Sequence, residues 1–353
     1  MSVQQKHLNM TESRTKLQTW IESFRIHISG VRRFSARTCE IYSDALRRFA
    51  DFVGDVDTIT PSVIRDYEVY LIDGEKLQSK TTNLHMSVLG SFCTWLVRTG
   101  ELKSNPMKTV RRPKIPKRLP EFYREDSMSE YFARTDIYAS PEFLESFRAA
   151  FSLAAEGNKD AEAQAHELYE KRLERAVIST LLNLGIRRGE LIGMNIGDLD
   201  TSRRVVLIRG KGDKMREIPV IPSLCEEILL YLNAVETMAG GKRNAMDAMF
   251  VTWSGRRIYP VLVDRIVKGE LSQIAGITGR RSPHVLRHTL ATELLDGGTD
   301  LNSIKEMLGH ASLATTQVYT HNSIAKLKQV YGAAHPRAES RSETDLKPAI
   351  YNN

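Results

Sequence analysis

The sequence predicts a mainly α-helical protein of two domains with one small β-hairpin or sheet. Its 353 residues suit two to three domains of about 100–200 residues each. Apolar residues recur at helical spacing through most of the chain, whereas one short region has the pattern of two paired strands. Three prolines within residues 111–120 interrupt the helical pattern. Because proline disfavours helix, this stretch is predicted to be an extended connector between the two domains.

Four amphipathic helices are expected in the amino-terminal part. They begin near Leu17, Ser35, Pro61 and Ser79, and the last should end at Gly100. Proline directly after Thr60 is typical of the first position of a helix. The residues expected to face inward are Leu17, Trp20, Ile21 and Phe24; Ile41, Ala45, Leu46, Phe49 and Phe52; Val63, Ile64, Tyr67 and Leu71; and Leu84, Val88, Leu89, Phe92 and Leu96.

The larger carboxyl-terminal part should contain the hairpin. Two β-branched runs, 204–208 and 215–221, flank a Gly-Lys-Gly-Asp turn at 210–213. Residues 141–170 are mostly polar and are interpreted as an exposed helix or loop insertion, followed by an apolar helix over 174–184. The expected organisation is a flexible amino terminus 1–13, a helical domain 14–110, a basic linker 111–120, a larger domain 121–338 and a disordered tail 339–353.

Composition favours a polyanionic partner. The net charge is +7, and Lys and Arg cluster at several points, although such clusters can also be solvated surface. A membrane span is not expected, because the chain has no apolar run of about 18 residues. The polar residues 1–13 do not resemble a secretory signal, so a cytoplasmic protein is expected. Cys39, Cys93 and Cys225 lie far apart, which argues against a disulfide framework or a cysteine zinc site.

Several polar residues have the setting of a phosphate site. Ser282 and Pro283 suit the start of a helix, which would place His284 in its first turn and Arg287 on the same face. A helix amino terminus favours anions, although a His-x-x-Arg pair alone is weak evidence. Arg187 stands at a turn-to-helix junction, and Lys211 lies between two glycines at the hairpin tip.

The order of these motifs resembles the tyrosine recombinase family. It runs Gly-Ile-Arg-x-x-Glu-Leu at 185–191, Gly-Lys-Gly at 210–212, Pro-His-x-Leu-Arg-His at 283–288 and Leu-Gly-His at 308–310. Tyr319 follows nine residues after His310. Residues 315–321 and 330–338 are similar to the Xer branch of that family. The resemblance extends over about 17–338 and implies a two-domain DNA clamp, with a helical core-binding domain followed by a catalytic domain.

The resemblance also implies a role for each motif residue. Tyr319 would attack the scissile phosphate and form a 3′-phosphotyrosine, and Lys211 would protonate the leaving 5′-oxygen. The phosphate would be held by Arg187, Arg287 and His310, His284 would take the tyrosine proton or hold the phosphate, and Glu190 would support its neighbours. The residues expected to contact DNA are Arg37, Arg47, Arg48, Lys80, Arg111, Arg112 and Lys114.

This set supplies a nucleophile, a proton donor and charge neutralisation, so neither a metal nor another cofactor is expected. ATP use is not expected either, because the sequence contains no phosphate-binding Gly-x-x-x-x-Gly-Lys-Ser/Thr loop. The partners that the resemblance implies are a double-stranded DNA site, three further protomers of this chain or of a second recombinase, and an FtsK-like translocase.

Three functions stay open at this point. Resolution of chromosome or plasmid dimers is favoured by the short chain and its ending, whereas the polar segment 139–170 keeps integration or excision of a mobile element open. The competing class is a non-catalytic helix-turn-helix protein that uses residues 300–320. Such a protein would bind DNA without becoming covalently attached to it.

Overall fold

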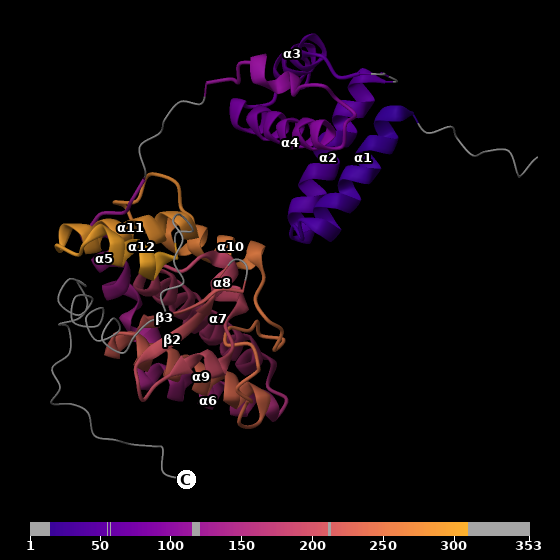
Figure 1. Cartoon of the computed structure of the whole chain (residues 1–353). Helices are drawn as coiled ribbons and strands as arrows, with labels where there is room; N and C mark the ends of the chain where they lie inside the picture. The colour runs from indigo at the N-terminus through magenta and orange to yellow at the C-terminus, as the bar shows by residue number, and fades with distance from the viewer. Residues whose placement is uncertain (1–14, 55, 57, 115–120, 211–212, 310–353) are drawn as a thin grey trace, which may run out of the picture. The chain divides into compact units, whose positions relative to one another are not determined.

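The computed structural model describes residues 15–54, 56, 58–114, 121–210 and 213–309, and the chain divides into two compact units, Met1–Arg118 and Leu119–Asn353 (Figure 1). These are called the first and second units. The described part is helical apart from one three-stranded sheet in the second unit, which confirms the predicted mainly α class. The expected flexible ends and most of the basic linker lie outside the described residues. No helix in the described part is long and apolar enough to cross a membrane.

The first unit contains the four predicted helices (Figure 1). Their starts follow from side chains that satisfy the unpaired backbone N–H groups of a first turn. The Thr15 hydroxyl accepts from the Gln18 amide, and the Thr60 hydroxyl accepts from the Val63 amide just after the predicted Pro61 start. The helices are α1 (Lys16–Ile26), α2 (Ala36–Val53), α3 (Pro61–Val69) and α4 (Ser79–Arg98), with π-helical turns at His27–Val31 and Tyr70–Gly74 and a 3₁₀ turn at Pro106–Thr109.

The core of this unit is formed largely by the predicted faces. Phe24 of α1 and Phe92 of α4 are buried with their ring centroids 5.3 Å apart. The inward position predicted for Leu84 is wrong, because this side chain is 44% exposed. Its neighbour His85 is buried instead and forms a 3.0 Å hydrogen bond with the Tyr67 hydroxyl. That bond satisfies two polar groups inside an otherwise apolar core, so a histidine can take the inward position.

The second unit is organised around α7, which packs against α6, α9, α10 and α11 (Figure 1). Almost every residue in the last half of α7 is buried, as expected for a helix that is surrounded by others. The α-helices of the second unit are α5 (Glu125–Thr135), α6 (Pro141–Ala155), α7 (Lys159–Leu184), α8 (Arg188–Gly193), α9 (Pro222–Ala239), α10 (Pro260–Ser272), α11 (Pro283–Asp296) and α12 (Leu301–Leu308).

Residues 141–170, interpreted as an exposed helix or loop insertion, are helical and mostly exposed, but one face of the segment is buried in the core, which the interpretation missed. This segment and the helix expected over 174–184 form α6 and one continuous α7, which turn back on each other at 156–158. Phe147 of α6 is buried beside Ala165 and Tyr169 of α7, and all three belong to the main core. Alanines on α7 let the two helices approach closely, and this explains how a segment of polar composition can still contribute a buried face.

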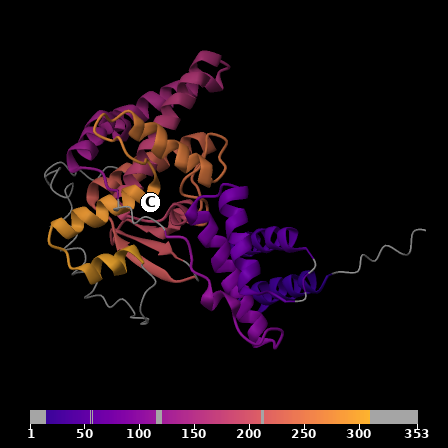
Figure 2. The same ribbon diagram turned by 90° about the horizontal axis from the view of Figure 1, so that it is seen from above.

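A small antiparallel sheet, whose strands are drawn as arrows in Figure 2, packs against α8 and α12. Strand β2 (Val205–Arg209) pairs with β3 (Met215–Pro219) as the predicted hairpin, with Arg209 opposite Met215. A further strand, β1 (Leu199–Asp200), pairs with the other edge of β2 and is too short to have a sequence pattern. The hairpin places residues 210 and 213 at its described turn, whereas 211 and 212 lie outside the described residues.

Two glycines end helices in the same left-handed conformation but in different surroundings. Gly185 closes α7 with φ 58°, and Gly240 closes α9 with φ 69°. A Cβ at position 185 would stand 2.6 Å from Leu308 Cδ2 and 2.8 Å from Leu290 Cδ2, whereas a Cβ at 240 would meet nothing within 4 Å. Gly185 is therefore required for both its backbone conformation and its close packing.

We predict that Gly185→Ala destabilises the second unit much more than Gly240→Ala does. The control should lower the free energy of unfolding by about 1 kcal/mol, the penalty for a left-handed alanine. Gly185→Ala should lower it by about 1–3 kcal/mol more, because the core around Leu290 and Leu308 is overpacked. Urea unfolding of both variants measures the difference, and equal losses would contradict the packing argument.

Candidate active site

The site begins where α7 ends. Gly185 turns the chain, and Arg187 precedes the first residue of α8 in an extended conformation. The Glu190 carboxylate then accepts from the Arg187 backbone N–H at 2.9 Å and from Arg187 Nη1 at 2.8 Å. The local sequence therefore caps its own helix and at the same time fixes the Arg187 guanidinium. The structure brings this predicted pair together.

Arg216 of β3, which the sequence analysis missed, completes this arrangement. Its Nη2 and Nη1 donate to the two Glu190 carboxylate oxygens at 2.7 and 3.2 Å, and its Nε donates to the Met307 carbonyl at 2.8 Å. Arg216 is only 7% exposed. Alternation along the strand puts position 216 on the same side as buried Ile218. An arginine at an inward strand position was the available sequence signal, since such a charge requires a buried partner.

Burial and hydrogen bonding act in opposite directions on Glu190. Burial alone would raise the pKa of its carboxyl, but the hydrogen bonds from Arg216 and Arg187 are stronger together and lower the pKa below its ordinary value. Glu190 is therefore ionised at neutral pH. It can act as a fixed negative centre between the two arginines.

At the end of α12, three successive backbone carbonyls each accept a hydrogen bond from a different arginine guanidinium. Met307 O accepts from Arg216 Nε, Leu308 O accepts from Arg287 Nη2, and Gly309 O accepts from Arg187 Nη2 at 2.8 Å. The last carbonyls of a helix lack intrahelical partners and carry its partial negative charge, so cations are favoured there. Gly309, which follows the last residue of α12, has the left-handed conformation that ends the helix.

Arg287 also links this helix end to the end of α7. It projects from α11, is 5% exposed and donates from Nη1 to the Gly185 carbonyl at 2.7 Å. Burial, with nearby Arg187 as the next cause, lowers the pKa of Arg287 to about 10, which leaves it charged at neutral pH. Arg187 is more accessible, with 37% of its side chain exposed. The structure thus holds the two predicted arginines at one helix end.

His284 lies in the first turn of α11, as predicted, and its residue is exposed, unlike Arg287 three positions later. Although the residue is exposed, partial burial of its ring is the largest cause of a lowered pKa, followed by the positive charges of His288, Arg280, Arg287 and Arg188. His284 is therefore neutral at pH 7 and can accept a proton. The Ser282 hydroxyl does not cap α11 as expected, since it has no hydrogen-bond partner among the described residues. The other three predicted catalytic residues, Lys211, His310 and Tyr319, lie outside the described residues.

The predicted DNA contacts of the first unit differ in their surroundings. Arg37 pairs with Glu40 at 3.0 Å, Arg47 pairs with Asp44, and Arg48 pairs with Glu75. Their charges are partly neutralised by acidic neighbours on the protein surface, which makes them weaker candidates for binding phosphate. The candidates that are exposed without an ion pair among the described residues are Lys80, Arg111, Arg112 and Lys114.

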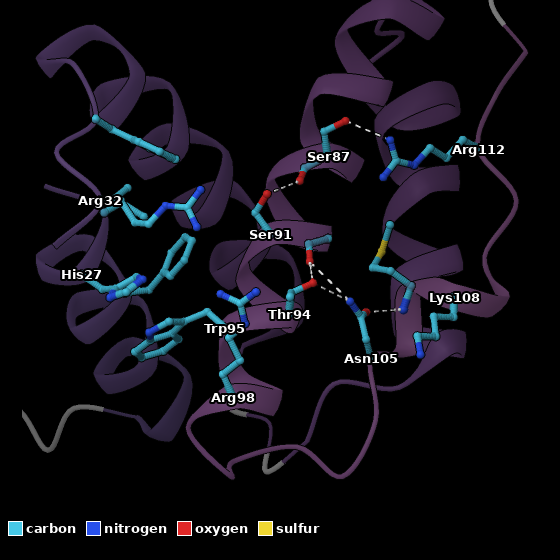
Figure 3. Close-up of a pocket in the computed structure, with 15 residues that line it drawn as sticks. His27, Arg32, Ser87, Ser91, Thr94, Trp95, Arg98, Asn105, Lys108 and Arg112 are labelled. Atoms are coloured by element: carbon cyan, nitrogen blue, oxygen red, sulfur yellow. Dashed lines mark hydrogen bonds between the residues drawn. The ribbon is translucent and has the colours of Figure 1, made fainter. Parts of the chain in front are cut away.

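A pocket of about 470 Å³ in the first unit gathers further cations (Figure 3). We call it the basic pocket. Arg32, Arg98, Lys108 and Arg112 line it, no lining residue is acidic, and none of the four forms an ion pair in the described part of the chain. The polar side of α4 supplies Ser87, Ser91 and Thr94. Arg112 Nη1 donates to the Ser87 hydroxyl at 3.0 Å, so this linker residue is held over α4 (Figure 3).

The remaining features of the basic pocket suit a sugar–phosphate chain. Trp95 lies at one side, near His27 (Figure 3). The centroid of its ring is 6.0 Å from that of His27 and 5.4 Å from that of Phe24. Asn105 Nδ2 donates to the Thr94 hydroxyl at 2.9 Å. Hydroxyl and guanidinium groups without internal acidic partners are the donors that phosphate oxygens accept. Of this pocket, only Arg112 was among the predicted contacts.

The two units thus combine a mainly helical fold with a cluster of arginines suited to a phosphodiester, as in enzymes that break and rejoin DNA strands. The chain belongs to the tyrosine recombinase family. Residues 21–100 match the phage integrase N-terminal SAM-like domain, and residues 159–326 match the phage integrase family. Both matches confirm the family, and the relatives below confirm the resemblance to the Xer branch.

The curated relatives extend over nearly the whole chain. The tyrosine recombinase XerC of Chlorobaculum tepidum is 31% identical and aligned over 90% of this chain and 95% of its own length. The tyrosine recombinase XerC of Pelobacter propionicus is 33% identical over 92% and 97%.

Solved structures share the fold at lower identity. The XerH recombinase bound to a palindromic difH substrate is 17% identical, with a TM-score of 0.59 over 91% of this chain and 90% of that one. The Tn1549 transposon integrase bound to transposon right-end DNA is 16% identical, with a TM-score of 0.60 over 90% and 99%. The predicted fold class is therefore confirmed.

We predict that cleavage by this chain is lost as the pH falls through the lowered pKa of His284. If neutral His284 takes the proton of the nucleophile, its protonation below its ordinary pKa of 6.5 removes the acceptor. The single-turnover cleavage rate should therefore be level above neutrality and fall at lower pH. In His284→Gln the rate should be lower throughout, and this acidic fall should disappear. An identical acidic fall in the variant would assign it to another group.

Proposed function

We propose that this chain is a site-specific recombinase that exchanges DNA strands through a 3′-phosphotyrosine at Tyr319, in Xer-type resolution of chromosome or plasmid dimers. The observation that carries the proposal is the end of α12. There, Arg187 and Arg287 are bonded to the carbonyls of residues 309 and 308, directly before His310 and ten residues before Tyr319 in the sequence. A nucleophile that follows this helix end would act beside two fixed positive charges.

The proposed step balances without a metal or nucleotide. The Tyr319 oxygen forms a bond to the scissile phosphorus, and the bond from phosphorus to the 5′-oxygen breaks. His284 accepts the tyrosine proton, Lys211 donates a proton to the 5′-oxygen, and Arg187, Arg287 and His310 stabilise the extra negative charge on the phosphorane. Reversal with the 5′-hydroxyl of another strand restores a phosphodiester, so the energy of the broken bond is conserved.

The first unit is proposed to hold the duplex through the basic pocket rather than mainly through Arg37, Arg47 and Arg48. The four cations of the pocket have no acidic partner among the described residues, whereas those three arginines do. Binding a phosphate backbone releases counterions, and cations that are not already neutralised contribute most to that release.

Assembly of four protomers on two DNA sites is also proposed. Structures of lambda integrase, which share this fold at 17% identity and a TM-score of 0.55, include a tetramer bound to a Holliday junction. The other protomers would be copies of this chain or of a second recombinase. The assembly would act in the cytoplasm, and an FtsK-like translocase would activate it.

A mobile-element role is the second candidate. Similarity to the Tn1549 transposon integrase supports it only at the level of fold, whereas the XerC relatives match at 31–33% identity over nearly their full lengths. An excision assay on plasmids distinguishes the two roles. It compares directly repeated chromosomal sites with the ends of a neighbouring element.

We predict that the wild-type chain forms a covalent adduct with a nicked suicide duplex without metal or ATP. The nick lets the short fragment that carries the new 5′-hydroxyl diffuse away after cleavage, which prevents religation and traps the phosphotyrosine. Tyr319→Phe should bind the same duplex with unchanged affinity and form no adduct on a denaturing gel. Tight binding by wild type without any adduct would favour the non-catalytic DNA-binding alternative, once addition of a partner recombinase had also failed.

We predict that Arg98→Ala/Arg112→Ala weakens DNA binding and makes it less sensitive to salt. Loss of two phosphate contacts should reduce the slope of log affinity against log salt by about 2. The control Arg37→Ala/Arg47→Ala removes the same charge from ion-paired positions and should change the slope by less than about 1. Fluorescence anisotropy at several salt concentrations measures both, and a larger change in the control would favour α2 as the phosphate contact.

A further inference from the structure

We propose that Arg216 is a positioning residue for strand cleavage, which orients Arg187 through the shared carboxylate of Glu190. This inference rests on the proposed function. Arg216 does not need to touch the phosphate, because its nitrogen atoms are directed to Glu190 and to the Met307 carbonyl. Its effect on the reaction passes through the groups that it holds.

The first hold is on the carboxylate. Glu190 receives four hydrogen bonds, with each oxygen shared between the two arginines: Oε1 accepts from Arg187 Nη1 and Arg216 Nη1, and Oε2 accepts from the Arg187 amide and Arg216 Nη2. The two-pronged contact of Arg216 defines the plane of the carboxylate. The orientation of the carboxylate in turn determines where Arg187 Nη1 must lie to donate to Oε1.

The second hold is on the end of α12. Arg216 Nε donates to Met307 O, while Arg187 Nη2 donates to Gly309 O two residues later. Arg216 therefore locates both acceptors that Arg187 uses, one directly and one through the helix end. Both Glu190 and Arg216 are less than one-tenth exposed, so water cannot readily replace either contact.

Neighbouring glycines show how closely this guanidinium is enclosed. A Cβ at Gly309 would stand 3.1 Å from Arg216 Cζ, and a Cβ at Gly210 would stand 3.5 Å from Arg216 Nη1. Gly210 begins the hairpin turn, and Gly309 ends α12. The Arg216 side chain thus packs against the hairpin turn and the end of α12, which directly precede the predicted catalytic residues Lys211 and His310. The flat guanidinium fits between these two glycines, where a thicker group would not.

Lysine and methionine test different parts of this role. Arg216→Lys keeps the positive charge but has a single nitrogen, which cannot bond to both carboxylate oxygens and Met307 O with the same geometry. Arg216→Met keeps much of the volume and leaves Glu190 with Arg187 as its remaining arginine. The matched control is Arg203→Met, since Arg203 also forms a two-pronged pair, at 3.1 and 2.8 Å, with Glu217 on the same sheet.

The test measures single-turnover adduct formation on the nicked duplex at saturating DNA, normalised to the folded fraction of each variant. A second duplex carries a methylphosphonate at the scissile position, which has lost one non-bridging oxygen and its charge. Because its transition state needs less charge neutralisation, it depends less on a well-placed Arg187. Thermal unfolding and DNA affinity are measured for each variant.

Arg216→Lys and Arg216→Met should lower the cleavage rate about 10- to 100-fold on the ordinary phosphate, as expected for a misplaced catalytic group, with DNA affinity unchanged. The defect should shrink at least several-fold on the methylphosphonate, and Arg203→Met should cleave as wild type does. If Arg216→Met does not fold, the cleavage rates of Arg216→Lys on the two duplexes decide the result.

Two results would overturn the proposal. Variants that only unfold earlier and cleave normally per folded molecule would make Arg216 purely structural. A defect of equal size on both duplexes would show that Arg216 does not act through Arg187. Failure of the proposed function has a different signature, because wild type would then form no adduct on either duplex, and this inference would fall with it.

Discussion

A buried carboxylate is stable in a protein only where its hydrogen-bonding capacity is filled, and Glu190 meets that condition with four donors from Arg187 and Arg216. Three structural elements meet at this carboxylate: α8 carries it, β3 carries Arg216, and α12 supplies a carbonyl to each arginine. A shift in any one of them would leave a charge partly unpaired in a region with little water. The requirement to pair Glu190 therefore determines how these elements join.

The same contacts also satisfy the carbonyls at the end of a helix, which have no intrahelical partners. Helix α12 ends at Gly309, and the carbonyls of residues 307–309 accept from three different arginines. In many helices these groups would be satisfied by water or by local turns. Here the cations that complete the helix include the two proposed to bind the scissile phosphate. Function and stability consequently share the same side chains, so substitution of Arg287 should affect both.

The sequence predicted the elements whose causes are local. The four helices of the first unit follow from apolar spacing and, for α3, from Thr60 directly before Pro61. The hairpin follows from two β-branched runs about a glycine turn. The burial of α6 was missed because average composition conceals a narrow apolar face. Leu84 was misplaced because a histidine with a buried tyrosine partner occupies the inward position instead.

The site was predictable to a similar extent. Motif order indicated Arg187, Glu190, His284 and Arg287, and local spacing explains how Glu190 reaches Arg187. Arg216 and Glu190 are 26 residues apart in the sequence, so no local pattern could identify Glu190 as the partner of Arg216. Among the expected DNA contacts, the Arg37–Glu40 and Arg47–Asp44 pairs have helical spacing and were visible in the sequence. The Arg48–Glu75 pair joins distant segments and required the structure.

The cations of the two units differ in how they are held, and the difference suits two separate tasks. In the basic pocket, the arginine and lysine side chains are exposed and have no acidic partner among the described residues, so their counterions are released when an anion binds. In the second unit, Arg187 and Arg287 are already fixed by carbonyls and a carboxylate. Fixed charges do not need to reorganise as the phosphorane forms, which is the condition for electrostatic catalysis. Mobile ions screen exposed charges far more than buried ones. Salt should therefore govern how tightly the DNA is held, whereas the rate of cleavage in the bound complex should depend on the buried hydrogen bonds around Glu190.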